Sequence, residues 1–280
     1  TVLLKQALMP NLVQTLENNP AIIHGGPFAN IAHGNSSIIA DRLALGASDF
    51  VVTEAGFGSD MGAEKFMHIK AANSGKSPDC VVMNVTVRSM KLHGGAFGAR
   101  AARRPSKEEI ETENVDAVRI GAESNLDRHI KNMSQFGMPV VVSVNRFSSD
   151  TDAELQCIIE CAQASGAANV CLTEVHAKGG VGGEPLAKAV VTACQDHLAA
   201  GRPFTPLFNP STPLEEKALR IATRLYGADG INIRAKADRQ LKQIQSWGYG
   251  ELPVCMAKTQ YSFSHDANLL GAPTGFEIPI

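Results

Sequence analysis

The sequence lacks a dominant charge of either sign, a long apolar run and an export signal. Its 280 residues carry 26 Lys and Arg against 28 Asp and Glu, a formal net charge of −2. Without a basic excess, a nucleic acid held by phosphate neutralisation is excluded as a partner. No stretch of about 18 apolar residues is present, so no membrane-spanning helix is expected. Residues 1–12 carry one Lys and no cleavage pattern, so no signal peptide is predicted.

Several motifs that mark catalytic and cofactor sites are also missing. There is no G-x-x-x-x-G-K-[ST] phosphate loop, no G-x-S-x-G and no H-E-x-x-H. The sequence Gly56-x-Gly58-x-x-x-Gly62 misses the spacing of the dinucleotide fingerprint by one residue. The motifs therefore identify neither a Rossmann site nor a common hydrolase.

Cysteine and histidine are present, but not at the spacing of a metal site. The six Cys residues include no C-x-x-C pair and lie mostly in apolar or helical stretches, which is typical of reduced, buried thiols. Cys157 and Cys161 share one helix face, but too few further ligands lie near them. The eight His residues show no metal spacing either. We predict no metal site and a cytoplasmic protein.

What the sequence does contain is an alternation of strand-like and helix-like segments. Apolar residues make up 44% and charged residues 19%, a globular composition. Apolar runs rich in β-branched residues predict strands at 21–24, 50–53, 80–87, 139–144, 169–173, 230–233 and 253–257. Most of these lack period-two alternation, as strands covered on both faces do. The pattern predicts an α/β protein with a doubly wound, mostly parallel sheet.

The helices between these strands have recognisable starts. Apolar residues three or four apart predict a helix over 112–137. Capping boxes at Thr151–Glu154 and at 212–215 predict two further helix starts, the second with Pro213 at the first helical position. Two segments interrupt the alternation. The Gly- and Arg-rich stretch 94–105, with Arg100, Arg103 and Arg104, predicts a surface loop. The Pro-rich stretch 198–212 predicts a linker, giving domains at 1–200 and 201–280.

The loops that follow four of the predicted strands are the candidate ligand site. They lie at 25–37, 54–60, 145–150 and 174–183, and each holds an aromatic or His residue and polar groups. All but 145–150 are rich in Gly. Ligands of open α/β sheets bind beyond the carboxyl ends of the strands, so these loops predict a cofactor-binding rim. The alternatives stay open: Phe57 and Phe147 are core or ligand contacts, His176 is a ligand contact, an acid–base group or structural, and Gly179–Gly183 is a flexible loop or a phosphate cradle.

Four stretches at these loops resemble the formate–tetrahydrofolate ligase family. They are G26-PFANIAH-G34, V51-VTEAGF-G58, V87-RSMKLHG-G95 and L252-PVCMAKTQYSFS-H265. The resemblance extends from about Leu3 to Ile280 and covers the central and C-terminal part of the family. The family's N-terminal part, with its phosphate loop, precedes the matched region. Together with the missing initiator Met, this leads us to expect a piece of a longer protein.

The resemblance implies a nucleotide domain of the P-loop NTPase type, with a smaller C-terminal α/β unit. It implies ligation of formate to tetrahydrofolate with ATP and Mg²⁺ through formyl phosphate, giving 10-formyltetrahydrofolate, ADP and phosphate. Bacterial members of the family are commonly homotetramers helped by monovalent cations. The catalytic Lys and Arg are expected upstream, so no catalytic residue is assigned. Lys91, Lys178 and Lys258 lie in family-like motifs and are interpreted as structural or rim charges.

The resemblance also carries over six binding residues. Ala29, Gly56 and Phe57 match positions that line the nucleotide end of the site. Phe147 matches an aromatic residue that stacks on the pterin ring, and Leu172 matches a neighbour in the same pocket. His176 stands where the family usually has Trp, which reduces the stacking surface and predicts looser folate binding.

Other departures from the family concern the β-strand before Arg88 and the loop after it. Asn84-Val85 replaces a usual Val-Ala. Residues 96–105 resemble an insertion of about ten residues in a surface loop, where arginines are placed to meet a polyglutamate tail. Two alternatives remain: a non-catalytic folate- or nucleotide-binding module, and a different α/β nucleotide enzyme. The length of the matched stretches argues against the second.

Overall fold

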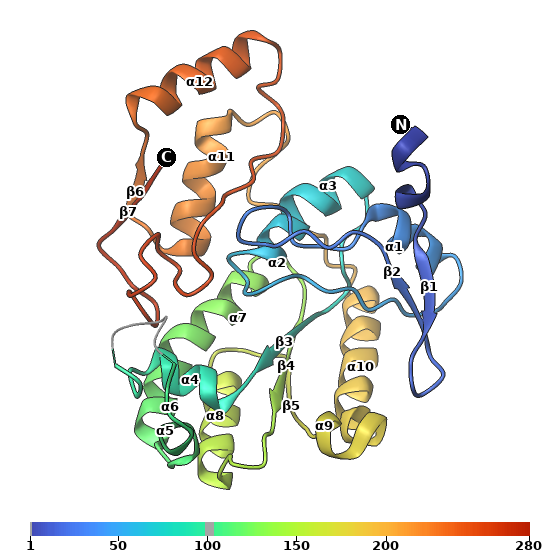
Figure 1. Ribbon diagram of the computed structural model, residues 1–280, viewed down its shortest axis with the longest axis vertical. Helices are drawn as coiled ribbons and strands as arrows, with labels where there is room; N and C mark the ends of the chain where they lie inside the picture. The colour runs from blue at the N-terminus through green and yellow to red at the C-terminus, as the bar shows by residue number, and fades with distance from the viewer. Residues whose placement is uncertain (1, 99–103) are drawn as a thin grey trace. The chain divides into compact units, whose positions relative to one another are not determined.

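The computed structural model describes residues 2–98 and 104–280 (Figure 1). The chain folds into two compact units. Unit 1 comprises the residues up to Lys76 together with Pro253–Lys258, and unit 2 comprises Ser77–Leu252 and Thr259–Ile280. The predicted division at residue 200 is a different partition and stays a prediction.

Unit 1 begins with two short 3₁₀ turns and a β-hairpin. The turns are η1 (Val2–Leu4) and η2 (Gln6–Leu8), and the hairpin pairs β1 (Asn11–Gln14) with β2 (Pro20–Ile23) antiparallel. The predicted strand at 21–24 is therefore present, but its predicted place in the parallel sheet is wrong. A tight turn with Asn18 in the left-handed conformation folds the chain directly back on β1, and such a connection gives antiparallel strands.

Two helices complete unit 1. Helix α1 (Ile38–Leu45) begins at Ser37, whose Oγ accepts the N–H of Ala40 at 3.0 Å. The second is continuous through α2 (Gly62–Lys65), the π-helical turn η3 (Phe66–Lys70) and α3 (Ala71–Ser74), and it ends at Gly75 with φ +68°.

Two predicted strands of unit 1 are wrong. The runs 50–53 and 253–257 form no strand in the described chain. Near the first, only Ala55 makes an isolated bridge, to Asn35. A short apolar run becomes a strand only where a partner strand lies beside it, and neither run has one in this unit.

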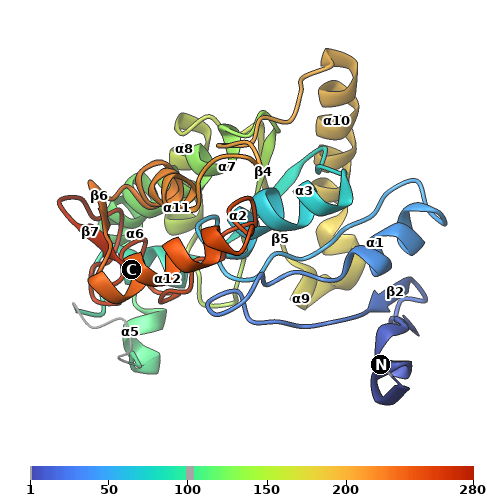
Figure 2. The ribbon, with the colours of Figure 1, turned by 90° about the horizontal axis from the view of Figure 1, so that it is seen from above.

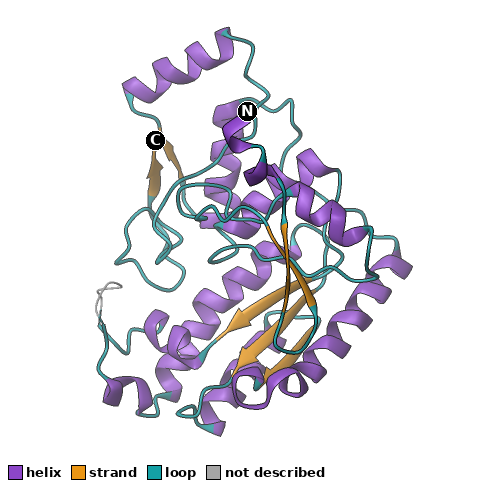
Figure 3. Ribbon diagram, turned by 45° about the vertical axis from the view of Figure 1, so that its right-hand side comes forward, coloured by secondary structure: helices purple, strands orange, loops and turns teal. Residues whose placement is uncertain are grey.

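Unit 2 is built on a parallel sheet, drawn as arrows in Figure 3. Strands β3 (Val81–Val85), β4 (Val140–Asn145) and β5 (Asn169–Thr173) lie in the order β3-β4-β5. The register pairs Val85 with Val144, and Asn145 with Thr173. The predicted α/β class with parallel strands is confirmed, while the P-loop NTPase type stays a prediction.

The central strand β4 is buried along its first five residues because helices cover both faces of the sheet. Helix α10 (Glu184–Ala200) packs Ala189 and Ala193 against Val141 and Cys171. Helices α7 (Asp127–Ser134) and α8 (Asp152–Ala164) lie on the other side in both views (Figures 1 and 2). This arrangement explains why the strand sequence VVVSV shows no alternation.

The helices that follow β3 cross at two glycines. They are α4 (Val87–His93) and α6 (Val115–Gly121). Helix α6 continues through the π-helical turn η4 (Ala122–Leu126) into α7. A Cβ at Gly94 would lie 1.8 Å from the Ala117 carbonyl oxygen, and one at Gly121 would lie 2.1 Å from that of Met90. The predicted helix over 112–137 is confirmed over most of its length, and Asn114 caps its start.

Helix α5 (Lys107–Glu111) follows the Arg-rich stretch and is opened by a capping box at Ser106. Arg100 and Arg103 of the predicted 94–105 loop lie outside the described residues, and so does half of the expected insertion at 96–105. Arg104 is described, and it is exposed. The role of these arginines stays a prediction.

The two predicted capping boxes have different outcomes. At α8, Thr151 Oγ1 accepts the Glu154 N–H at 3.3 Å and Glu154 Oε2 accepts the Thr151 N–H at 3.2 Å, as predicted. The box at 212–215 is wrong, because Pro213 is extended (φ −56°, ψ 148°) and is itself the N-cap, without a side-chain hydrogen bond. Helix α11 (Leu214–Ile221) thus starts one residue later than predicted and continues into η6 (Ala222–Tyr226).

The remaining elements of unit 2 follow β5 or close the chain. After β5 come α9 (Val175–Lys178) and the 3₁₀ turn η5 (Gly179–Gly183), which lead into α10. Strand β6 (Gly230–Asn232) pairs in parallel with β7 (Glu277–Pro279), and α12 (Ala235–Ser246) follows β6.

Candidate functional site

Ala29, Gly56 and Phe57 come together in unit 1. Ala29 is 1% exposed. A Cβ at Gly34 would lie 2.2 Å from the Ala29 Cβ, and one at Gly56 would lie 3.1 Å from it. The N–H of Gly56 also donates to the Gly34 carbonyl oxygen at 2.9 Å. The small residues of the two loops therefore let their backbones pack directly on one another.

Phe57 extends from this contact into solvent. Its side chain is 55% exposed, and its φ of +61° places it in the left-handed region, which bulky residues rarely adopt. Such strained residues cluster at ligand sites, where the surrounding structure holds them. The exposed ring on a strained backbone next to Gly56 fits a ligand contact rather than the core alternative.

Two buried lysine side chains bind the 25–37 and 54–60 loops of unit 1. Lys65 donates its Nζ to the Ala29 carbonyl oxygen, and the backbone N–H of Lys258 donates to the Asn30 carbonyl oxygen at 3.1 Å. Lys258 Nζ also pairs with Asp60 Oδ2 at 2.7 Å, and both side chains are buried. Burial lowers the pKa of Lys65, partly offset by the nearby Cys255 thiol and Glu64. The interior of unit 1 is thus organised by charge as much as by apolar packing.

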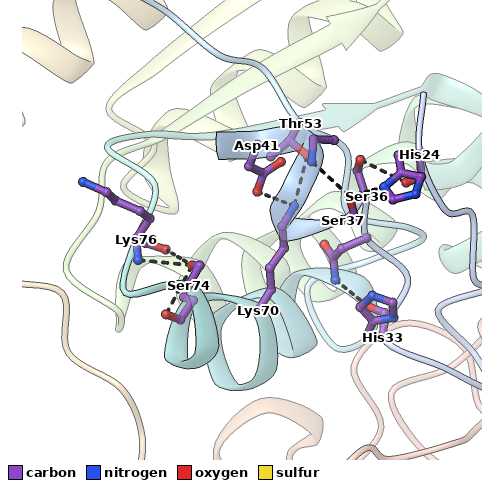
Figure 4. A network of polar contacts seen from close by, with 12 residues as sticks. His24, His33, Ser36, Ser37, Asp41, Thr53, Lys70, Ser74 and Lys76 are labelled. Atoms are coloured by element: carbon purple, nitrogen blue, oxygen red, sulfur yellow. Dashed lines mark hydrogen bonds and ion pairs between the residues drawn. The ribbon is translucent and has the colours of Figure 1, made fainter. Parts of the chain in front are cut away.

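A second polar network joins the 33–37 loop and α1 to the long helix of unit 1 (Figure 4). Lys70 Nζ contacts Asp41 Oδ2 at 2.7 Å and Thr53 Oγ1 at 3.5 Å. His24 Nδ1 lies 2.6 Å from Ser37 Oγ, the cap of α1. Burial, and then Lys70 and Lys65, lower the pKa of His33. These contacts position the loop that contains Ala29.

Phe147, Leu172 and His176 belong to unit 2, at the carboxyl edge of its sheet. Leu172 is half-buried on β5 opposite Val144. Phe147, 52% exposed, follows β4, and His176, also exposed, lies in α9 after β5. The Arg146 N–H donates to the Thr173 carbonyl oxygen at 3.0 Å, so the two strand ends stay paired up to these loops. The predicted folate residues thus come from adjacent strand ends.

The glycine run after His176 is folded into the turn η5. The Glu174 N–H donates to the Gly182 carbonyl oxygen at 3.1 Å, and a Cβ at Gly182 would lie 2.5 Å from the Glu174 carbonyl oxygen. Lys178 Nζ lies 2.5 Å from Glu174 Oε2 on the surface, and this hydrogen bond lowers the pKa of Glu174. Lys178 is therefore a rim charge, and the phosphate-cradle alternative for Gly179–Gly183 stays untested.

Lys91 and Glu154 form a buried ion pair near the Phe147 loop. Lys91 Nζ lies 2.7 Å from Glu154 Oε1, and it donates to the carbonyl oxygens of Ile110 and Thr112 at 3.0 and 2.9 Å. The Asn114 N–H also donates to Glu154 Oε1, at 2.8 Å. Lys91 and Lys258 thus have structural roles.

The sequence interpretation missed the roles of Lys65, Asp60 and Glu154 as buried partners. Lys65 lies four residues after Met61, on the same helix face as a buried apolar side chain, which is a readable signal. Asp60 and Glu154 have no such signal for their long-range partners, because these approach only in the folded chain.

One cavity of unit 2 lies away from the predicted rim. A cavity of about 170 Å³, lined by Pro139, Asn169 and residues of α10, opens at the amino ends of β4 and β5, opposite the predicted rim. Within residues 2–98 and 104–280, no group of three or more His, Cys, Asp and Glu side chains is placed to hold a metal ion. No helix of these ranges is long and apolar enough to span a membrane.

Comparison with known proteins gives a match along the whole chain. A family model described as formate–tetrahydrofolate ligase matches residues 1–280. Proteins named formate–tetrahydrofolate ligase from Granulibacter bethesdensis and Ruegeria sp. are each 51% identical over 280 residues, and one from Paracoccus denitrificans is 49% identical. All of this chain is covered, against 46%, 48% and 48% of those proteins. The chain spans about half the length of the curated relatives it matches.

Proposed function

This chain belongs to the formate–tetrahydrofolate ligase family, and from that premise we propose that it takes part in the ATP-dependent ligation of formate to tetrahydrofolate. In the proposed reaction a formate oxygen attacks the γ-phosphorus of ATP, giving formyl phosphate and ADP. The N10 amine of tetrahydrofolate then attacks the formyl carbon, phosphate leaves, and the amine loses its proton to give 10-formyltetrahydrofolate.

We propose that this chain binds and orients the folate rather than supplying the phosphoryl-transfer groups. The observation that carries this proposal is the exposed Phe147 ring beyond the central strand, beside the loop of β5 that holds His176. A flat heterocycle is bound well by offset stacking on an aromatic face. Leu172, half-buried on β5, supplies apolar surface at the same edge. Holding the pterin in one orientation would bring N10 to the formyl carbon.

Ala29, Gly56 and Phe57 are proposed to contact the nucleotide, as the family resemblance implies. Phe57 exposes its ring on a strained backbone, and the buried ammonium groups of Lys65 and Lys258 stabilise the loops. Mg²⁺ would arrive with the ATP phosphates, since this ion is usually held by one or two carboxylates and by the phosphates. No residue of this chain is assigned to Mg²⁺ or to a monovalent cation.

A homotetramer acting in the cytoplasm is proposed from the family resemblance. Size measurement of the purified protein, with and without potassium, tests the assembly. A monomer under all conditions would contradict it.

The test of the reaction uses the complete polypeptide that carries this sequence. We predict ATP- and formate-dependent formation of 10-formyltetrahydrofolate, and Phe147→Ala raises the KM for tetrahydrofolate about tenfold, because stacking and burial of the ring are lost. The KM for ATP should change less than twofold. Tyr249→Ala removes another exposed aromatic ring of unit 2 and is the matched control. An unchanged KM for tetrahydrofolate in Phe147→Ala would contradict the assignment.

The alternative is a non-catalytic folate- or nucleotide-binding module. It is favoured by His176, which stands where the family resemblance implies Trp. Binding of tetrahydrofolate without any turnover by the complete polypeptide would support this alternative. The alternative of an unrelated nucleotide enzyme is wrong, since the family match covers the whole chain.

A further inference from the structure

The loop that carries Phe147 is closed by the side chain of Asp150. Asp150 Oδ2 accepts the backbone N–H of Phe147 at 2.8 Å, and the backbone N–H of Asp150 donates to the Phe147 carbonyl oxygen at 3.1 Å. The two hydrogen bonds fix both peptide groups that flank the Phe147 Cα. This backbone sets the direction of the Cα–Cβ bond and so limits the positions that the ring can reach.

The rest of the chain covers the Phe147 side chain only in part. Phe147 is 52% exposed, and it makes no ring contact with another aromatic side chain of residues 2–98 and 104–280. A half-exposed side chain depends in good part on its backbone for its position. Asp150 bonds both backbone groups of Phe147 and so supports that position.

Asp150 is in turn anchored by the start of α8. Its neighbour Thr151 is the N-cap and forms the reciprocal capping box with Glu154. Glu154 is fully buried and is held by Lys91 and by the Asn114 N–H. The chain from α4 to α8 thus provides a rigid base from which the Asp150 carboxylate reaches back to Phe147.

The protein environment disfavours the ionised form of the Asp150 carboxylate. Burial, and then Glu154, raise the pKa of Asp150, while the Phe147 N–H, Lys91 and Arg146 lower it, and the net direction is upward. Partial burial thus costs this carboxylate free energy that its contacts only partly offset. Within residues 2–98 and 104–280, its hydrogen bond is to the Phe147 backbone.

We propose that Asp150 is a positioning residue that sets the Phe147 ring for stacking on the flat ring of the substrate. The proposal rests on the proposed function, because it needs a pterin at Phe147. Asp150 does not touch the substrate, and it acts only through the Phe147 backbone. An Asn at this position keeps an oxygen acceptor for the Phe147 N–H, and an Ala does not.

The test compares Asp150→Ala, Asp150→Asn and the control Glu160→Gln in the complete polypeptide. Glu160 is an exposed carboxylate two turns further along α8. Two quantities are measured: the Kd for tetrahydrofolate and the hydrogen-exchange rate of the Phe147 amide. We predict that Asp150→Ala raises the Kd about tenfold and speeds exchange of this amide by a similar factor. Asp150→Asn and Glu160→Gln should stay within about twofold of the parent in both.

Different failures identify different errors. A parent that does not bind tetrahydrofolate contradicts the proposed function and, with it, this role of Asp150. A parent that binds, together with an Asp150→Ala variant of unchanged Kd, overturns the positioning role alone. A loss in Asp150→Asn as large as in Asp150→Ala also overturns it, because the acceptor would then not be what matters. A variant that unfolds is recognised by fast exchange along the whole of β4, and Asp150→Asn then decides between these outcomes.

Discussion

Lys65 and Lys91 carry their ammonium groups into the interiors of unit 1 and unit 2, and the two sites differ in their partners. Lys91 pairs with the carboxylate of Glu154, as a buried charge usually must. Lys65 donates to the carbonyl oxygen of Ala29, and burial lowers its pKa. The Lys65 site therefore costs free energy that its hydrogen bond only partly offsets, which suggests that its position has a use beyond stability.

Replacement of Lys65 by Met should separate stability from nucleotide binding. The variant loses the hydrogen bond to Ala29 but no longer buries a charge, so we expect its free energy of unfolding at pH 7 to change by less than about 2 kcal/mol. The KM for ATP should rise about fivefold or more, because the Ala29 loop is released. Urea unfolding and steady-state kinetics measure the two, with the exposed Lys76→Met as control.

The lowered pKa of Lys65 predicts how the free energy of unfolding changes with pH. Its pKa is lower in the folded chain than the ordinary 10.5, so between the lowered value and 10.5 the unfolded chain binds more protons. The parent should therefore gain stability as pH rises through this window, and Lys65→Met should gain less. Equal pH dependence of the unfolding midpoint in both proteins would contradict the buried position of Lys65.

His176 stands where the family resemblance implies a Trp in the proposed pocket. An imidazole offers less stacking surface than an indole, so His176→Trp should lower the Kd for tetrahydrofolate about threefold to tenfold. The Kd for ATP, measured in the same way, should not change. Equal tetrahydrofolate affinities of parent and variant would show that residue 176 does not contact the pterin.

At the scale of elements, the sequence predicts best where local pattern and tertiary context agree. The β-branched run of β4 and the capping box of α8 were both predictable, because burial on two faces and a local side-chain bond leave a trace in the sequence. The runs at 50–53 and 253–257 carry the same apolar signal and form no strand in the described chain. Whether such a run forms a strand depends on a partner strand beside it, and the local sequence does not show whether one is present.

The crossing of α4 and α6 depends on glycine in a way that a variant can test. Gly121→Ala would improve helix propensity by about 1 kcal/mol. Its new Cβ would nevertheless overlap the backbone carbonyl of Met90, which cannot move aside as a side chain can. We therefore expect a net loss of roughly 1–3 kcal/mol in the free energy of unfolding. Gly250→Ala, whose Cβ meets only the Gln245 side chain at 3.8 Å, should change it by less than 0.5 kcal/mol or so.

At the scale of the whole molecule, the two groups of predicted binding residues fall into different units. Ala29, Gly56 and Phe57 lie in unit 1, and the folate group of Phe147, Leu172 and His176 lies in unit 2. The rim was predictable only for the loops 145–150 and 174–183, which follow β4 and β5. It is wrong for the other two loops, because 25–37 follows a strand of the antiparallel hairpin and 54–60 follows no strand. The roles of their residues came from family resemblance, because a lone Phe or His has no role that spacing alone defines. The buried partners Lys65, Asp60 and Glu154 needed the folded structure.

The central claim is that the carboxyl edge of the unit 2 sheet binds the pterin of tetrahydrofolate. The most direct measurement is an experimental structure of the complete polypeptide with tetrahydrofolate bound. We predict a pterin ring stacked on Phe147, with ring centres about 4.5–7 Å apart, and with Leu172 and His176 in contact with the ligand. A folate bound elsewhere, for example at the cavity beside Ala189 and Ala193, with Phe147 exposed to solvent, would contradict the account.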